Sequence, residues 1–286
     1  MPSFKSILSK TKPLLPIVDG TFPPALTSGL SVFLVLLYLI NIYMDSKLFN
    51  AISLYSHAPL ELELNRLSMY PLGHANTFHL VMNIFAMIGP LSKFEVGHGT
   101  VHTGVVLNAL AVVTALIYCV LSGFFYPGAR VLGASAWWFS FAGFFAQRES
   151  VNRPHIHLFS NFVIPTIFSP LVPLVIITIL FPSGASFIGH VAGLLAGYLL
   201  AFGYLKFMVP PSKVIEFIES KVDFLINLIP SRIRYYRERD VKPIRDDSSS
   251  YVPMFIENSV LLTTNPLVAS PSEQSGFPGA GQALGV

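Results

Sequence analysis

The sequence predicts an all-α membrane protein with six transmembrane helices. Of its 286 residues, 52% are hydrophobic and only 12% are charged, and the mean hydropathy is +0.61. A soluble domain carries about 25% charged residues, so this composition excludes an ordinary soluble globule. The net charge of +3 gives no indication of nucleic-acid binding. The single cysteine, Cys119, excludes a disulfide scaffold and a cysteine-rich zinc site, and we expect neither metal nor cofactor.

Long runs without Lys, Arg, Asp or Glu indicate where the chain crosses the membrane. They cover residues 20–44, 67–92, 96–129 and 154–205. Because a helical crossing needs about 20 apolar residues, the first three runs predict one crossing each, at 25–44, 76–91 and 101–124. A short apolar run at 131–146 predicts the fourth. The last run is long enough for two crossings, at 163–181 and 187–207, separated by a Pro- and Gly-containing turn at 182–184.

The basic residues predict the orientation of these helices. With six crossings, both termini lie on one side together with the second and fourth loops, and that side holds 15 of the 18 Lys and Arg residues. The positive-inside rule therefore places both termini in the cytosol. The basic, acid-poor N-terminus also raises the alternative of a mitochondrial presequence, but it contains no Arg, and Pro13 and Pro16 interrupt it.

Changes in composition divide the chain into four parts. We expect an N-terminal segment at 1–24, a membrane domain at 25–208, an amphipathic helix with a basic segment at 209–245, and a disordered Ser-, Pro- and Gly-rich tail at 246–286. Apolar residues recur at helical spacing in 212–229, which predicts a helix lying on the membrane surface or packed on the membrane domain. The basic residues of 232–245 suit either an anchor to anionic lipid or a solvated linker.

Three of the predicted spans contain polar residues that a purely lipid-facing helix would not need. Ionisable groups inside a membrane are costly, so each is a functional candidate. The polar candidates are His74, His79 and Asn83 near the second span, Ser135 at the start of the fourth, and His190 in the sixth. Small residues accompany two of them: Gly133 and Ala136 lie beside Ser135, and Gly189, Gly193 and Gly197 lie in the span of His190. Each also has a simpler interpretation, as a helix cap, a close-packing glycine face or an interhelical hydrogen bond.

Together these residues suit nucleophilic catalysis. A serine hydroxyl becomes a strong nucleophile when a neutral imidazole takes its proton. The glycines of the sixth span let that helix approach the fourth, so that His190 reaches Ser135. The Ser135 amide at a helix N-terminus, with His79 and Asn83, supplies donors for the oxyanion that forms on a peptide carbonyl. No carboxylate lies in the fourth, fifth or sixth span, which predicts a Ser-His dyad rather than a triad.

At these residues the chain resembles the rhomboid intramembrane serine proteases. The family's His-x4-His-x3-Asn pattern corresponds to His74, His79 and Asn83, and its Gly-x-Ser-Gly motif to residues 133–136, with Ala136 in place of the final glycine. Its sixth-helix pattern corresponds to Gly189, His190, Gly193 and Gly197. Many rhomboids carry Trp-Arg in the first loop, where this chain has Asn65 and Arg66. The resemblance implies a six-helix rhomboid core in which Ser135 is the nucleophile, His190 the general base, and His79, Asn83 and the Ser135 amide the oxyanion hole.

The resemblance also implies partners and a location. The chain looks most like the fungal Golgi rhomboids, which implies a Golgi or endoplasmic-reticulum membrane, a surrounding lipid bilayer and transmembrane proteins as substrates. Its end resembles the Phe-x-Gly-x-Gly-x-x-Leu box that binds the valosin-containing AAA+ ATPase, on Phe277, Gly279, Gly281 and Leu284. The alternatives for these residues are a glycine-rich disordered end and, for the whole chain, a non-catalytic rhomboid-like receptor that delivers membrane proteins to that ATPase. Such receptors lack the Ser and His pair.

Overall fold

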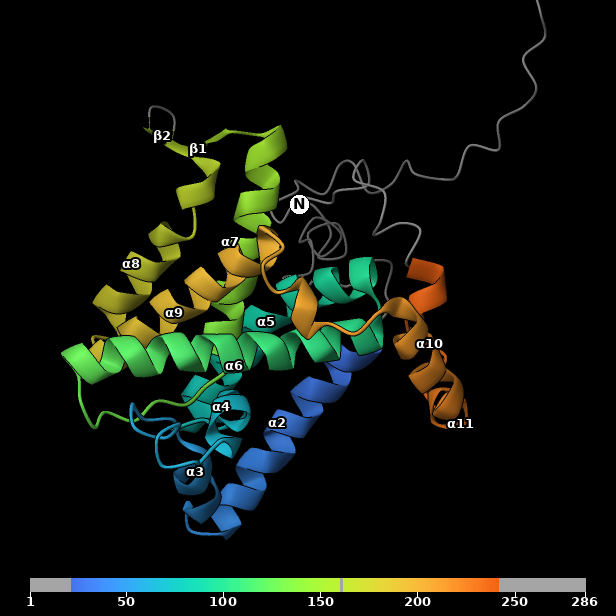
Figure 1. Cartoon of the computed structure of the whole chain (residues 1–286), viewed down its shortest axis with the longest axis horizontal. Helices are drawn as coiled ribbons and strands as arrows, with labels where there is room; N and C mark the ends of the chain where they lie inside the picture. The colour runs from blue at the N-terminus through green and yellow to red at the C-terminus, as the bar shows by residue number, and fades with distance from the viewer. Residues whose placement is uncertain (1–21, 160–161, 242–286) are drawn as a thin grey trace, which may run out of the picture. The chain divides into compact units, whose positions relative to one another are not determined.

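The computed structural model describes residues 22–159 and 162–241, and the described chain is mostly helical (Figure 1). The lysines of the N-terminal segment and the box at 277–284 lie outside these residues. Within the described residues, four helices are long and apolar enough to cross a membrane: α2 (Ala25–Tyr43), α5 (Thr77–His98), α6 (Thr100–Phe125) and α9 (Gly184–Ala201). This confirms a helical membrane fold, while the count of six crossings stays a prediction.

Shorter elements connect and flank these four helices. They are α3 (Lys47–Ile52), α4 (Asn65–Met69), η2 (Tyr70–Leu72), α7 (Ser135–Asn152), β1 (His155–Phe159), β2 (Phe162–Pro165), η3 (Thr166–Phe168), α8 (Leu171–Leu180), η4 (Lys206–Met208), α10 (Ser212–Lys221) and α11 (Asp223–Ile226).

The second helix continues beyond its predicted end. The prediction stopped at residue 91 because Lys93 and Glu95 follow, but α5 runs to His98. Glu95 is fully buried, and its carboxylate accepts hydrogen bonds from the backbone N–H groups of Leu26 and Thr27 at 2.8 and 2.9 Å. These N–H groups are in the first turn of α2, where they lack intrahelical acceptors and the helix dipole favours an anion. A remote helix therefore supplies the partners that make this buried charge tolerable.

α7 is the central helix of the fold and is also longer than predicted. The prediction ended near residue 146, before the charged residues, whereas α7 continues to Asn152. Glu149 is buried and pairs with Arg153 at 3.5 Å. α7 contacts α5, α6 and α9, and Phe139 and Phe141 on it are fully buried. Because protein rather than lipid surrounds α7, the helix tolerates a polar last third.

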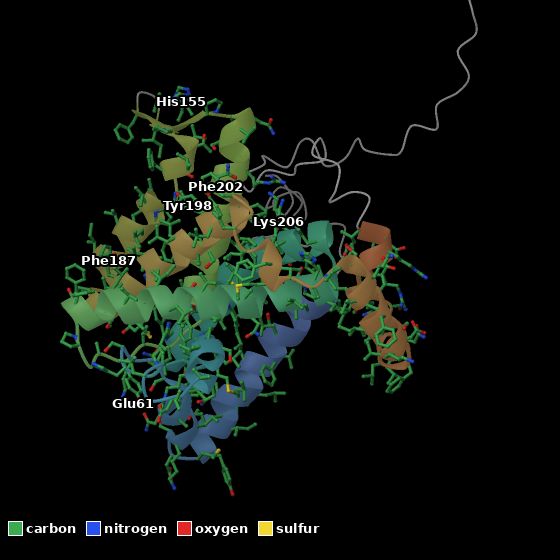
Figure 2. All side chains as sticks on the ribbon, viewed as in Figure 1. Glu61, His155, Phe187, Tyr198, Phe202 and Lys206 are labelled. Atoms are coloured by element: carbon green, nitrogen blue, oxygen red, sulfur yellow. The ribbon has the colours of Figure 1, made fainter. Side chains whose placement is uncertain are left out.

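The region predicted as a fifth transmembrane helix is partly a hairpin. Residues 155–159 and 162–165 form two antiparallel strands in which His155, labelled in Figure 2, pairs with Pro165. The helix α8 that follows has only 10 residues, or about 15 Å, against a hydrocarbon core of about 30 Å. Pro165 favours the extended backbone of β2, because a proline disfavours helical backbone in the residue before it, here Ile164. The prediction of a continuous helix over 163–181 is therefore wrong.

The sixth helix is shifted toward the N-terminus relative to its prediction. Ser183 caps α9 by accepting the Ser186 N–H at 3.3 Å. The helix ends at Ala201, and Gly203 follows with a φ of +83°, a conformation that glycine adopts without strain.

The amphipathic segment after α9 forms two helices rather than one. The predicted helix over 212–229 breaks at Val222, so that α10 ends at Lys221 and α11 begins at Asp223. Of the predicted apolar face, Ile215 is fully buried, whereas Ile218 and Leu225 are 39% and 50% exposed.

Candidate active site

Ser135 stands at the first residue of α7, and the chain before it is held on both sides. Val131 exchanges two backbone hydrogen bonds with Leu54, at 2.8 and 2.9 Å. The Gly133 N–H then donates to the Tyr70 carbonyl at 3.1 Å. The N-cap position of α7 is Ala134, so the interpretation of Ser135 as a simple helix cap is not supported. Its hydroxyl is available for another role, and its backbone amide belongs to the first helical turn, where N–H groups lack intrahelical acceptors.

His190 lies directly opposite Ser135. The His190 Nε2 and Ser135 Oγ atoms are 2.9 Å apart, although the two residues are 55 positions apart in the sequence. The imidazole is 8% exposed and packs against the Phe139 ring with a centroid distance of 4.6 Å. Within residues 22–159 and 162–241, no carboxylate forms an ion pair with His190. The ring is therefore oriented by packing against an aromatic neighbour.

Two glycines of α9 bring the helices of this pair together. A Cβ atom at Gly197 would lie 1.9 Å from the Ser140 carbonyl oxygen, and one at Gly193 would lie 2.4 Å from that of Ala136. Both glycines thus permit backbone-to-backbone contact between α9 and α7. Gly189 does not share this role, because a Cβ there would meet only a Val131 methyl at an ordinary 3.6 Å. The prediction that Gly189 belongs to the close-packing face is therefore wrong.

The α7 side of this crossing contains two small residues that the sequence analysis missed. A Cβ at Gly143 would come within 2.7 Å of the Leu194 carbonyl oxygen. The buried Ser140 hydroxyl donates to the Gly193 carbonyl at 2.9 Å, which links the two helices directly. Ala136, Ser140 and Gly143 follow one another at spacings of four and three, which places them on one helix face. This small-residue pattern was the available signal.

His79 lies against Gly133, the first residue of the serine motif. Gly133 has a φ of +126°, and a Cβ there would lie 2.6 to 2.8 Å from the His79 ring atoms Cε1 and Nε2. The Ala75 N–H points at Nδ1 at 3.4 Å, which assigns the ring proton to Nε2. His79 therefore presents a donor toward the backbone beside Ser135. The Asn76 side chain caps α5 by accepting the His79 N–H at 2.8 Å and thereby fixes where this helix begins.

Asn83 and His74 are less directly placed. Asn83 is buried one turn along α5 from His79, and its amide donates to the His79 carbonyl at 2.7 Å. An amide nitrogen carries two hydrogens, so one N–H remains for another acceptor. The His74 ring is 1% exposed and meets the His79 ring edge-on at 5.2 Å between centroids. His74 thus packs against the ring of His79.

Ala136 adopts helical backbone as the second residue of α7. Its φ is not positive, so a side chain at this position causes no backbone strain. The methyl group is buried, with the residue 4% exposed. The replacement of the family's final glycine is therefore compatible with this backbone.

The first loop is anchored by arginine and tyrosine. The buried Arg66 donates to the Asn50 and Ser53 carbonyls at 2.9 and 2.8 Å and pairs with Glu63. The hydrogen bond from Arg66 lowers the pKa of the Glu63 carboxyl. Tyr55 donates to Glu61, which is labelled in Figure 2. This hydrogen bond, together with desolvation and the hydrogen bond to Glu63, raises the pKa of Tyr55 to about 12.

Asn65, at the position where many rhomboids carry tryptophan, is exposed. The aromatic anchor of this loop is instead Tyr55, whose ring lies 5.2 Å from the Arg66 guanidinium and 4.7 Å from that of Arg130. In the part of the chain that the structure describes, no group of three or more His, Cys, Asp or Glu residues is arranged to hold a metal ion.

Comparisons with known proteins agree on one family. Residues 61–207 match the model of the Rhomboid domain. "Rhomboid-type serine protease 2" of Eremothecium gossypii is 42% identical over 92% of this chain and 95% of its own length. The proteins of that name from Debaryomyces hansenii and Saccharomyces cerevisiae are 42% and 39% identical, covering 92% and 85% of this chain and 92% and 95% of their own lengths.

Proposed function

Because this chain belongs to the rhomboid family and is a serine protease, we propose that it cleaves peptide bonds in or beside the transmembrane segments of membrane proteins through a Ser135–His190 dyad. The observation that carries this proposal is the 2.9 Å contact between His190 Nε2 and Ser135 Oγ. Ser135 is the nucleophile and His190 the general base. The lipid bilayer is the medium of the reaction, and membrane-embedded proteins are the substrates.

The first half of the reaction forms an acyl-enzyme. Ser135 Oγ attacks the carbonyl carbon of the scissile bond while His190 Nε2 takes the hydroxyl proton. The negative charge that develops on the carbonyl oxygen is stabilised by the Ser135 N–H and the His79 Nε2–H, with the remaining Asn83 N–H as a further donor. Collapse of this intermediate breaks the C–N bond, and His190 gives its proton to the departing amine.

The second half hydrolyses the ester. Water loses a proton to His190 and attacks the acyl carbon, and the Ser135 oxygen leaves and regains that proton. The product is a carboxylic acid at the new C-terminus. Water reaches Ser135 from the side of the membrane on which α7 begins. A helical peptide bond is shielded by its own hydrogen bonds, so substrates are expected to contain helix-weakening Gly or Pro, with small residues near the cut.

A fluorophosphonate probe, which labels activated serines, tests the dyad directly. The purified protein should be labelled, and labelling should fall to background in both Ser135→Ala and His190→Ala. Ser150→Ala is the matched control, since Ser150 lies on the same helix and its hydroxyl donates only to the Gln147 carbonyl. Labelling that persists in folded Ser135→Ala protein would refute this mechanism. A folded wild type without any labelling would favour a catalytically impaired receptor.

The cellular setting of the protease belongs to the same proposal. The distribution of basic residues supports cytosolic termini. The resemblance to the fungal Golgi rhomboids supports a Golgi or endoplasmic-reticulum membrane. The box of Phe277, Gly279, Gly281 and Leu284 supports binding to the valosin-containing AAA+ ATPase, so that cleavage and extraction of a substrate are coupled.

Deletion of residues 277–284 tests the role of the box. The shortened protein should cleave a purified substrate at the wild-type rate but no longer co-purify with the ATPase. Phe277→Ala with Leu284→Ala should give the same result, because these side chains fill the pockets of the partner. Full ATPase binding by both variants would contradict this assignment.

A further inference from the structure

The segment after α11 is tied by its backbone to the ends of membrane helices. The Ala25 N–H donates to the Arg234 carbonyl at 2.9 Å, and the Thr100 N–H donates to the Tyr236 carbonyl at 2.8 Å. The Tyr236 N–H returns a hydrogen bond to the Thr100 hydroxyl at 3.0 Å. Ala25 and Thr100 are the first residues of the candidate spans α2 and α6. This strap, residues 234–238, therefore lies at the depth at which those spans leave the bilayer.

α10 is attached to this strap through its buried side. Glu219 is 3% exposed and accepts hydrogen bonds from the Glu238 N–H at 3.0 Å and the Tyr235 hydroxyl at 3.1 Å. Asp223 at the start of α11 pairs with Arg237 of the strap. α10 contacts α6, and Figure 1 shows it beside one end of that helix. These contacts hold α10 and α11 at the same boundary as the strap.

The other side of the two helices, together with the turn after α11, carries large apolar side chains that nothing in the described chain covers. The exposed fraction is 60% for Phe217, 66% for Phe224 and 74% for Leu228. Val214 and Leu225 belong to the same set, and we call these five residues the outer face. Water contact with so much apolar surface is unfavourable, at about 25 cal/mol per Å². A cover for this face is therefore expected in the native membrane.

The exposed charges of α10 and of the chain that follows α11 are mainly positive. Lys213, Lys221, Arg232, Arg234 and Arg239 are exposed, against the exposed carboxylates of Glu216 and Asp240. The Lys221 ammonium lies 5.3 Å from the centre of the Phe217 ring. An apolar face bordered by long basic side chains is typical of helices that lie in a bilayer interface, where the basic groups reach lipid phosphates.

We propose that α10 and α11 form an interfacial anchor whose outer face inserts into the bilayer leaflet at which α2 and α6 begin, with the surrounding lysines and arginines binding anionic lipid headgroups. The strap sets the depth of the anchor, because it fixes both helices to the ends of the spans. The cover is lipid rather than a protein, since lipid is already present at that depth on every side of the membrane domain.

Fluorescent labels at single cysteines test the insertion. Cys119→Ala removes the native thiol, and an environment-sensitive fluorophore is attached to Phe217→Cys or Leu228→Cys. Glu216→Cys and Ser220→Cys are matched controls on the exposed polar positions of α10. In liposomes of phosphatidylcholine and phosphatidylserine, the labels at 217 and 228 should be blue-shifted and strongly quenched by nitroxide lipids, and the controls should not.

Two results would overturn the anchor. Water-like emission at 217 and 228 in liposomes that contain only the purified, folded protein would show that lipid does not cover the outer face and would favour a protein partner. Equal quenching at all four positions would show that no face is selected. Replacing phosphatidylserine with phosphatidylcholine should reduce quenching at 217 and 228, and quenching that is unchanged by this replacement would refute the binding of anionic headgroups.

Discussion

At the scale of single residues, the two positions that flank Ala134 and Ser135 have opposite requirements. Gly133 has a φ of +126°, and a Cβ atom there would lie 2.6 to 2.8 Å from atoms of the His79 ring. A side chain there is strained and also displaces a proposed oxyanion donor. Ala136 is helical, so that glycine would add only backbone freedom in the unfolded chain. The departure from the family motif is thus at the position that tolerates it.

Gly133→Ala should therefore abolish fluorophosphonate labelling, while Ala136→Gly should leave it near the wild-type level. We expect Ala136→Gly to lower the free energy of unfolding by about 1 kcal/mol, since glycine is less favourable than alanine within a helix by roughly that amount. Probe labelling and thermal melts of both variants check this. Higher labelling in Ala136→Gly would mean that the methyl group obstructs the site.

At the scale of elements, the crossing of α7 and α9 positions the proposed dyad. Ser135 begins one helix and His190 lies within the other, so their 2.9 Å contact depends on how closely and at what angle the helices pack. Gly197 and Gly193 remove the side chains that would separate the backbones, and Ser140 links them by its hydrogen bond to Gly193. Interfaces of small residues with polar links are how membrane helices associate without a hydrophobic driving force.

Gly197→Ala should push the helices apart and reduce labelling at Ser135, because its Cβ would lie 1.9 Å from a backbone oxygen that cannot rotate away. Gly189→Ala is the matched control on the same helix and should retain labelling and thermal stability. Loss of labelling in the control, or none in Gly197→Ala, would show that this crossing does not set the geometry of the dyad.

At the scale of the whole molecule, Glu95 ties three membrane helices together at one end. Its carboxylate, at the end of α5, accepts hydrogen bonds from Leu26 and Thr27 of α2 and from the Thr100 hydroxyl of α6 at 2.9 Å. The same threonine binds the strap, so the proposed anchor and the membrane helices share one buried network. Buried networks of this kind are costly to leave half-satisfied.

Glu95→Ala should lower the apparent Tm in detergent markedly, since each buried donor left without an acceptor costs about 1–3 kcal/mol. Glu95→Gln retains an acceptor oxygen and the shape of the side chain, and should cost less. Thermal denaturation curves, in which unfolding is monitored by the loss of probe labelling, compare the two variants. Equal stabilities for both variants and the wild type would contradict the structural role assigned to this carboxylate.

The sequence by itself determined the apolar helices α2 and α6 almost to the residue, because transfer of an apolar segment into lipid depends on that segment alone. It also predicted Ser135, His79 and His190 as candidate site residues, because each is a polar residue whose type and spacing are unusual within an apolar span.

Only the tertiary structure decided what depends on remote partners. The extensions of α5 and α7 rest on Glu95 and Glu149, whose charges find partners in other helices or beyond the helix end. The hairpin before α8, the separate roles of Gly189 and Gly197, and the choice of Ile215 rather than Phe217 as the buried side of α10 follow from packing between segments far apart in the chain. Local patterns of hydrophobicity record that a face is apolar, but the neighbouring elements determine whether protein or lipid covers it.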